Sequence, residues 1–482
     1  MNKVLIGLVA GLVLVAVGAP AVCGWAIERG AEERLRNLTD LASFLSVRDH
    51  TFHRGWFSSE EVITFEVGAG LDVPLPLPAP GGAATPPKRP AFVVRNIIHH
   101  GPLPGLSTVA LASIETHVEA APGAAPLAKL PPAVHGSIAT TLDFTGGGRT
   151  VLSGAAIPDT DFGDGVHMTS DGGEIDFDFG PHFDTLAVTG KLPHFLMRKD
   201  GAMTMEANGW EVKFKAHRVL RSLYASDVDG TLGDFEITDL AMADPKLAKF
   251  GIRAARYVSS TSATAGFLDG TGVLTAREAH AAGKSVQGIK LDVAIEHWQA
   301  DAFEKLMAGL RKARNGAGAP AERVAEMTKI AKESGVTLLV NDPVVRVRDL
   351  ELSTEEGFAK VSASFRINGA TAKDFEPPLN PAVLLKKVRI EADISLDDEL
   401  ADLLDRPRTL PNSRTPAPSP LAGLIMQGYV TRAKGKTSTK FALIDGEPTL
   451  NGKPFSPAAL APPPPPARPG KPSRARPTSA GA

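Results

Sequence analysis

The chain has 482 residues, of which 43% are hydrophobic and 22% are charged, and its formal net charge at pH 7 is -2. This apolar content is enough for one long domain or a few compact ones, and it excludes a chain that is disordered throughout. The nearly neutral charge argues against a nucleic-acid-binding protein, which normally presents a basic face.

The first predicted element is an apolar helix over residues 4–27, because no charged residue lies between Lys3 and Glu28. At ~1.5 Å per residue, a helix of this length crosses a hydrocarbon core of ~30 Å. The apolar run continues past a small-residue segment at Ala19 to Ala21 that resembles a cleavage site, and it is longer than an ordinary signal-peptide core. We therefore expect an uncleaved membrane anchor, with cleavage as the alternative.

The helix is expected to continue beyond the anchor to about Leu41, because Leu35 and Leu38 fall at helical spacing. The charges that flank the anchor do not decide its orientation. The only cysteine, Cys23, lies within the anchor, so the rest of the chain is compatible with an oxidising compartment without disulfides.

Short runs rich in β-branched and aromatic residues follow, separated by Gly, Asp, Asn or Pro. This rhythm predicts antiparallel sheet and not alternating βα units. The predicted strands cover residues 47–52, 62–67, 92–98, 135–144, 150–156, 174–179, 185–192, 203–214, 230–237 and 272–276.

Two helices are predicted near residues 301–310 and 321–334, with Asp301 and Glu304 forming a capping box at the start of the first. Together they predict a helical hairpin packed on the sheet. A shorter helix is expected over residues 421–429. The remaining predicted strands cover residues 336–340, 344–350, 359–367, 388–394, 440–444 and 448–450, the last two joined at Asp445-Gly446.

We therefore predict an α+β fold with three parts: an N-terminal transmembrane helix (1–27), an elongated and mostly antiparallel β-sheet domain with a helical hairpin (28–456), and a tail (457–482). The tail contains consecutive prolines and several basic residues, which predict a disordered, extended segment. A Pro, Gly and Ala stretch at 74–90 predicts a surface loop.

Five short motifs occur in order along the chain. They are Met1-Asn2-Lys3 before the apolar run, His53-Arg54-Gly55-Trp56-Phe57-Ser58-Ser59, His100-Gly101-Pro102-Leu103-Pro104, Asp342-Pro343-Val344 and Leu450-Asn451-Gly452-Lys453-Pro454. With these motifs the chain resembles the YdgA-like family of bacterial envelope proteins, a domain of unknown function, from the anchor to about Phe455. The resemblance implies an uncleaved inner-membrane anchor and a periplasmic, largely β domain. It implies no established activity and supplies no catalytic residues.

The histidines are the main candidates for chemistry. His53 lies close in sequence to Ser58 and Ser59, but the G-x-S-x-G elbow that usually carries a catalytic serine is absent, so a structural corner is the preferred interpretation. His99 and His100 are adjacent on a predicted strand and would point to opposite faces, which argues against a shared metal ion. We predict no catalytic, cofactor-binding or metal-binding residue.

The sequence favours a non-enzymatic binding or scaffold protein of the cell envelope, because it contains no nucleophile elbow, metal-ligand spacing or phosphate loop. Two alternatives remain: a lipid or amphiphile carrier with an apolar β-sheet groove, and an envelope enzyme that uses His53 or His99/His100. The expected partner is the inner membrane, through residues 4–27. A lipid ligand and a homo-oligomer formed through edge strands remain open, and no cofactor or nucleic acid is expected.

Overall fold

The computed structural model describes residues 3–41, 45–67, 91–120, 136–163, 165–240, 242, 248–281, 283–315, 320–376, 379–405 and 420–456. The predicted surface loop at 74–90 and the predicted tail at 457–482 lie outside these residues.

Helix α1 (Lys3–Leu41) ends where the sequence predicted. Its side chains are described from residue 18 onward, so residues 4–17 of the predicted anchor lie outside the described side chains. In the part of the chain that is described, no helix combines the length and the apolar character needed to cross a bilayer.

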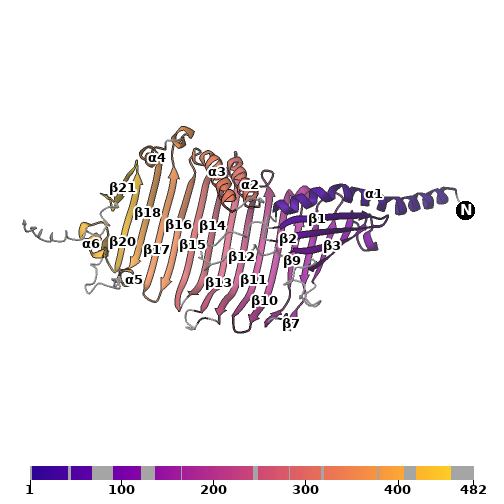
Figure 1. The fold of residues 1–482 in the computed structure, drawn as a ribbon, viewed down its shortest axis with the longest axis horizontal. Helices are drawn as coiled ribbons and strands as arrows, with labels where there is room; N and C mark the ends of the chain where they lie inside the picture. Colours follow the sequence, from indigo (N-terminus) through magenta and orange to yellow (C-terminus); the bar gives the residue numbers. More distant parts are fainter. Residues whose placement is uncertain are drawn as a thin grey trace, which may run out of the picture.

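Within the described residues, one antiparallel sheet collects 22 strands. This confirms the mostly antiparallel α+β architecture. The strands at the beginning of the sheet are short: β1 (Leu45–Arg54), β2 (Ser58–Val67), β3 (Ala91–His100), β4 (Ala112–Ala120), β5 (Ser137–Leu142), β6 (Gly148–Gly154), β7 (Ile157–Asp161), β8 (Val166–Ser170) and β9 (Gly173–Phe179). In Figure 1, β1–β3 run at a steep angle to the later strands, so the sheet turns sharply at this end.

The middle of the sheet is a meander of strands of 15 or 16 residues, each paired with the next along the chain. These strands are longer than predicted. They are β10 (Thr185–Lys199), β11 (Met203–Arg218), β12 (Tyr224–Asp239), β13 (Lys249–Thr264), β14 (Phe267–Ala281) and β15 (Lys284–Gln299).

The last part of the sheet is paired in the order β16, β17, β18, β20, with the short strands beyond β20 pairing along its outer edge. Asp445 and Gly446 have positive φ and form the predicted turn between β20 and β21. The strands are β16 (Val344–Thr354), β17 (Gly357–Ile367), β18 (Val388–Asp397), β19 (Thr431–Ala433), β20 (Lys436–Ile444), β21 (Glu447–Leu450) and β22 (Lys453–Pro454).

The predicted helical hairpin is present between β15 and β16. The strand predicted at 336–340 is wrong, because the second helix continues through Leu339.

The predicted capping box is also absent: the Gln299 side chain accepts from the Ala302 N–H, and the Glu304 carboxylate accepts from Ser222 in the turn before β12. The remaining helices are α2 (Ala300–Asn315), α3 (Pro320–Leu339), α4 (Pro381–Lys387), α5 (Asp398–Leu404) and α6 (Pro420–Gln427), with 3-10 turns at η1 (Pro104–Leu106), η4 (Pro181–Phe183) and η5 (Ala372–Phe375).

A row of irregular positions crosses the long strands. Leu192 pairs with Trp210 and His194 pairs with Asn208, which places Pro193 opposite Gly209. The flanking pairs on each later strand place one further residue in line with these two, as far as β15. The row, which we call the crease, consists of Pro193, Gly209, Gly233, Ala254, Arg277 and Gly288. Three of its members, on β11, β13 and β15, have positive φ.

The crease changes the alternation of side chains in these strands. On β10 the large apolar residues occupy the even positions Leu186, Val188 and Leu192 before the crease, and Phe195 and Met197 continue the face at odd positions after it; Leu196 is the exception. A residue with positive φ interrupts the strict up-and-down alternation of a strand, so the pattern restarts one residue later. We infer that this restart keeps the apolar side chains on one face of the sheet on both sides of the crease.

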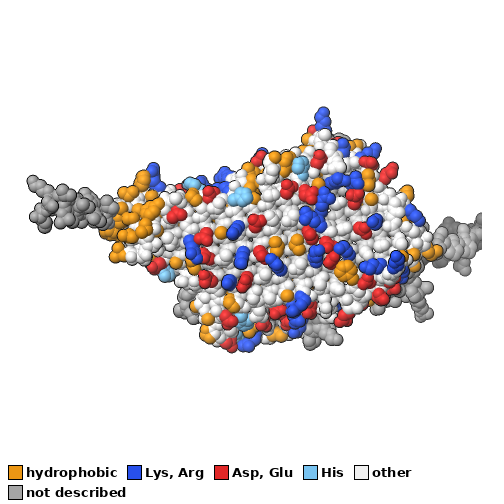
Figure 2. Space-filling view, turned by 180° about the vertical axis from the view of Figure 1, so that it is seen from behind, with side chains coloured by type: hydrophobic (Ala, Val, Ile, Leu, Met, Phe, Trp, Pro, Cys, Tyr) orange, Lys and Arg blue, Asp and Glu red, His pale blue; other side chains and the backbone are white. Residues whose placement is uncertain are grey.

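The opposite face of the sheet is covered by charged side chains of both signs (Figure 2). Ion pairs join neighbouring strands there, such as Arg256 with Asp229 on β13 and β12. Around Asp349, the Lys290 ammonium lies 2.7 Å from one carboxylate oxygen and the Lys360 ammonium 2.9 Å from the other. Hydrogen bonding to these lysines lowers the pKa of Asp349 from 3.8 to about 2.

The first part of the apolar face is closed by α1. Ile27 is fully buried against the core that includes Ile98 of β3 and Ala112 of β4. Gly24 lies directly over the imidazole of His100, so closely that a Cβ at this position would overlap the ring. The absence of a side chain at Gly24 therefore allows α1 to lie against the sheet.

The contact between Gly24 and His100 generates a first prediction. Gly24→Ala should destabilise the folded protein by about 1–3 kcal/mol, because the added methyl overlaps a ring that is held by hydrogen bonds on both sides. Gly18→Ala, on the same helix and with no described atom within 4 Å of the new Cβ, should be neutral or stabilising. Thermal denaturation of both variants measures the difference, and adding His100→Ala to Gly24→Ala should recover part of the loss. Equal melting temperatures for the two glycine variants would contradict this packing.

The lysine pair around Asp349 generates a second prediction. Because the pKa of Asp349 is lower in the folded than in the unfolded chain, its ion pairs stabilise the fold above about pH 4, and this contribution is lost as the pH falls toward 2. Asp349→Asn should therefore show a smaller drop in melting temperature between pH 5 and pH 2.5 than the natural chain. Glu355→Gln, in the exposed turn before β17, is the control and should keep the natural pH dependence. A full acid-induced drop in Asp349→Asn would exclude this role.

Candidate functional site

The largest continuous feature of the sheet is its apolar face. Because the strands are paired in register, side chains on this face line up in rows that run from β9 to β20. One row contains Phe177, Val188, Phe214, Val228, Ser259, Gly272, Val293, Val347, Ala363, Ala392 and Phe441, and the next contains Ile175, Gly190, Val212, Gly230, Tyr257, Leu274, Leu291, Leu350, Val361, Ile394 and Thr439.

Neither row contains a charged residue. Most of these side chains are half-buried, as expected where neighbours on the same sheet provide the only cover. Among the described elements, the main helix contacts lie toward the ends and edges of the sheet: α1 with β1–β4, α2 and α3 with β15, α4 with β18, and α5 with β17, β18 and β20. In Figure 1 no helix crosses the middle of β11–β14. The described chain therefore leaves the middle of the apolar face without a second packing layer.

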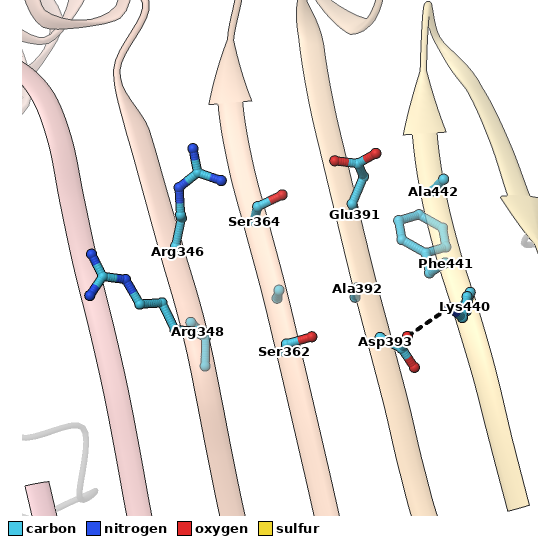
Figure 3. Close-up of a pocket in the computed structure, with 12 residues that line it drawn as sticks. Arg346, Arg348, Ser362, Ser364, Glu391, Ala392, Asp393, Lys440, Phe441 and Ala442 are labelled. Carbon is cyan, nitrogen blue, oxygen red and sulfur yellow. Dashed lines mark ion pairs between the residues drawn. The ribbon is translucent and has the colours of Figure 1, made fainter. Parts of the chain in front are cut away.

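A hollow of about 400 Å³ lies on the charged face over β16–β20 (Figure 3). The short side chains of Ser362 and Ser364 separate Arg346 on one side from Asp393 on the other. Arg346 already donates two hydrogen bonds to Glu296, at 2.9 and 3.1 Å, and Asp393 lies 3.1 Å from the Lys440 ammonium. Because these charges neutralise one another within the sheet, the hollow is a weak candidate for a charged ligand.

A second hollow, of about 380 Å³, lies on the charged face beside the crease. It is lined by carboxylates, including Glu206 and Glu236, which are directly opposite in the ladder, together with Arg253 and His280. Arg253 lies 3.2 Å from Glu278, and His280 lies 3.7 Å from Glu236. Among the described residues, no group of three or more His, Cys, Asp or Glu side chains is arranged to hold a metal ion.

The structure brings together two residues from separate sequence motifs. His100 Nε2 lies 2.8 Å from the Ser59 hydroxyl, and His100 Nδ1 lies 3.1 Å from the carbonyl oxygen of Trp56. Since a carbonyl only accepts, we assign the ring proton to Nδ1, and Nε2 then accepts from the serine hydroxyl. Burial lowers the pKa of His100, which keeps the ring neutral.

This serine–histidine pair does not form an accessible active site. Ser59 is 4% exposed and His100 is 3% exposed, and α1 covers them at Gly24. A substrate would have to displace the helix to reach the hydroxyl. The pair instead fixes the turn between β1 and β2 against β3, the structural corner that the sequence indicated.

The other candidate histidines lie apart from this pair. His99 lies 3.9 Å from Glu115, and His53 is exposed near the end of β1, opposite Glu60 in the ladder. Adjacent strand residues point to opposite faces, so His99 and His100 do not act together. The structure therefore brings together none of the three histidines His53, His99 and His100.

A buried polar network beneath the second half of α1 was not predicted from the sequence. Glu61 is 8% exposed; it lies 3.0 Å from His50 Nε2 and accepts a 2.7 Å hydrogen bond from the Asn96 amide. The Asn96 carbonyl oxygen in turn accepts from the Thr116 hydroxyl. Burial lowers the pKa of the nearby Arg34, partly offset by the charge of Glu61. One sequence signal exists: Glu61 occupies an inward position of β2, in line with the buried Ile63 and Phe65.

A model of the family described as "Bacterial protein of unknown function (DUF945)" matches residues 1–458. No curated protein and no solved structure is significantly similar to the chain. The family match covers the whole described sheet and ends at residue 458, so that residues 459–482 lie outside it. The chain therefore belongs to this DUF945 family of bacterial proteins.

Proposed function

We propose that the protein is a non-enzymatic, membrane-anchored binding protein of the bacterial envelope that holds the acyl chains of a lipid or another amphiphile on its apolar sheet face. The observation that supports this most strongly is the pair of uncharged rows that cross the sheet from β9 to β20. A face of this kind costs free energy in water, at roughly 25 cal/mol per Å² of apolar surface, so an apolar occupant that covers it is strongly favoured.

The dimensions of the face suit a chain-like ligand. At ~4.8 Å between neighbouring strands, a row from β9 to β20 is roughly 50 Å long. It runs across the strands without an interrupting charge, so an acyl chain could lie at any point along it. The scaffold interpretation requires an interface with a folded protein. Such an interface is normally a complementary patch of limited size with polar residues at its rim. The extended, uniform surface favours the carrier interpretation.

The location in the envelope is part of the proposal, as is the finer assignment to the YdgA-like family. It rests on the apolar run at 4–27, which leads directly into the part of α1 that packs on the sheet. The outer side of this helix exposes Val22 and Trp25, and the Arg29 guanidinium lies 4.4 Å from the centre of the Trp25 ring. An aromatic residue beside an arginine is typical of a helix that meets the membrane interface. This arrangement would place one end of the apolar face beside the inner membrane, with the domain in the periplasm.

A paired substitution on β17 tests the proposal. Val361 and Ser362 are adjacent and half-buried, but Val361 belongs to the apolar row and Ser362 lies in the hollow on the charged face. Full-length Val361→Glu should retain at least fivefold less co-purified lipid by native mass spectrometry, because the charge makes the face unfavourable for acyl chains. Ser362→Glu, with the same new side chain on the opposite face, should retain the natural amount.

Circular dichroism of both variants controls for folding. Lipid recovery that is unchanged by Val361→Glu in a folded protein would contradict the proposal. A natural chain that elutes without lipid as a homo-oligomer would favour the scaffold interpretation instead.

A further inference from the structure

Several glycines occupy apolar-face positions in the long strands, where a side chain would normally contribute to the face. They are Gly190 on β10, Gly230 on β12, and Gly270 and Gly272 on β14. None of them has positive φ, so the backbone conformation does not require glycine. Glycine in the interior of a strand costs stability and often marks a position where another molecule or backbone approaches closely.

Two aromatic rings cover glycines on this face. The ring of Trp210, on β11, reaches over Gly190, where a Cβ would lie 3.0 Å from the ring atoms. The ring of Tyr257, on β13, reaches over Gly272, where a Cβ would lie 3.4 Å from the phenol oxygen. Trp210 therefore leans toward β10 and Tyr257 leans toward β14, away from the strand between them.

That strand is β12, and its glycine is left uncovered. Among the described residues, a Cβ at Gly230 would meet no atom closer than 3.8 Å, and the nearest side-chain atom belongs to Val212. Gly230 pairs with Val212 on one side and Tyr257 on the other. We call this uncovered position, bounded by Val212 and Tyr257, the Gly230 gap. The strands β11 and β13 are about 9–10 Å apart. Because Gly230 on β12 has no side chain, the gap between Val212 and Tyr257 spans this distance.

We propose that the Gly230 gap is the seat of one acyl chain of the bound amphiphile, with the Trp210 and Tyr257 rings flanking it. This assignment rests on the proposed function and makes it specific to one position. The missing side chain allows an alkyl chain to approach the backbone of β12, and the neighbouring Val228, Val212 and Leu232 provide apolar contacts.

The hydroxyl of Tyr257 lies over β14, 3.4 Å from where a Cβ on Gly272 would be, at the end of its ring that points away from the seat. The side chain is 45% exposed in a row without charged residues, and among the described residues its hydroxyl makes no hydrogen bond. A tyrosine that presents an apolar ring and a free hydroxyl suits an amphiphile at the point where the alkyl chain meets its ester or carboxyl group.

The experiment uses a palmitic acid analogue that carries a photoreactive diazirine and an alkyne, fed to cells that express the full chain. After irradiation, cross-linked peptides are identified by mass spectrometry. The natural chain should be labelled in peptides from β11–β13. Gly230→Leu should reduce this labelling at least fivefold, because the new side chain occupies the gap.

Thr231→Leu is the matched control. Thr231 is the next residue on the same strand, but it is exposed on the charged face between Glu211 and Arg256. The same leucine there should leave labelling unchanged. If Gly230→Leu lowers the melting temperature, Gly230→Ala replaces it; its methyl group has room, so it should fold normally and still reduce labelling at least twofold.

The labelling results distinguish the assignment to the Gly230 gap from the proposed binding of an amphiphile. If folded Gly230→Leu or Gly230→Ala is labelled as strongly as the natural chain, while Val361→Glu loses its labelling, the assignment to the Gly230 gap is overturned and the amphiphile-binding function stands. A natural chain that is not labelled at all would overturn both.

Discussion

The alternation of side chains along register-paired strands is the constraint on which this protein depends. In a sheet that packs against a second layer, the apolar face is buried between the two layers. Here the long strands β10–β15 direct apolar residues to one face and charged residues to the other, and the described helices contact the sheet mainly at its ends and edges. Pairing between neighbouring strands and ion pairs on the charged face stabilise the sheet, and no described helix covers the middle of its apolar face.

Two local features preserve this arrangement. At the crease, the alternation of side chains shifts by one residue at the same level in six neighbouring strands. A shift in one strand alone would place its apolar side chains on the opposite face from those of its neighbours. At the first end of the sheet, Gly24 and His100 allow α1 to pack closely on the apolar face. The helix that leads from the predicted anchor thus closes one end of the face and leaves its middle uncovered.

Much of the fold could be predicted from residue patterns, and the failures have local causes. The end of α1 at Leu41 and the turn at Asp445-Gly446 follow from helical spacing and turn chemistry. The predicted strand that stopped at Leu192 continues in the structure to Lys199, because Pro193 sits in the crease and the strict two-residue period ends there. Strand β13 was missed since its Arg, Ser and Thr residues and the shift at Ala254 hide the alternation. The apolar face itself could not be located, because it depends on the register between strands far apart in sequence.

A cryo-EM structure of the full chain, purified from cells without added lipid, tests the central claim most directly. The account predicts elongated, non-protein density along the rows of the apolar face between β10 and β18. A second layer of protein packed over these rows, from the chain itself or from a partner, would contradict it.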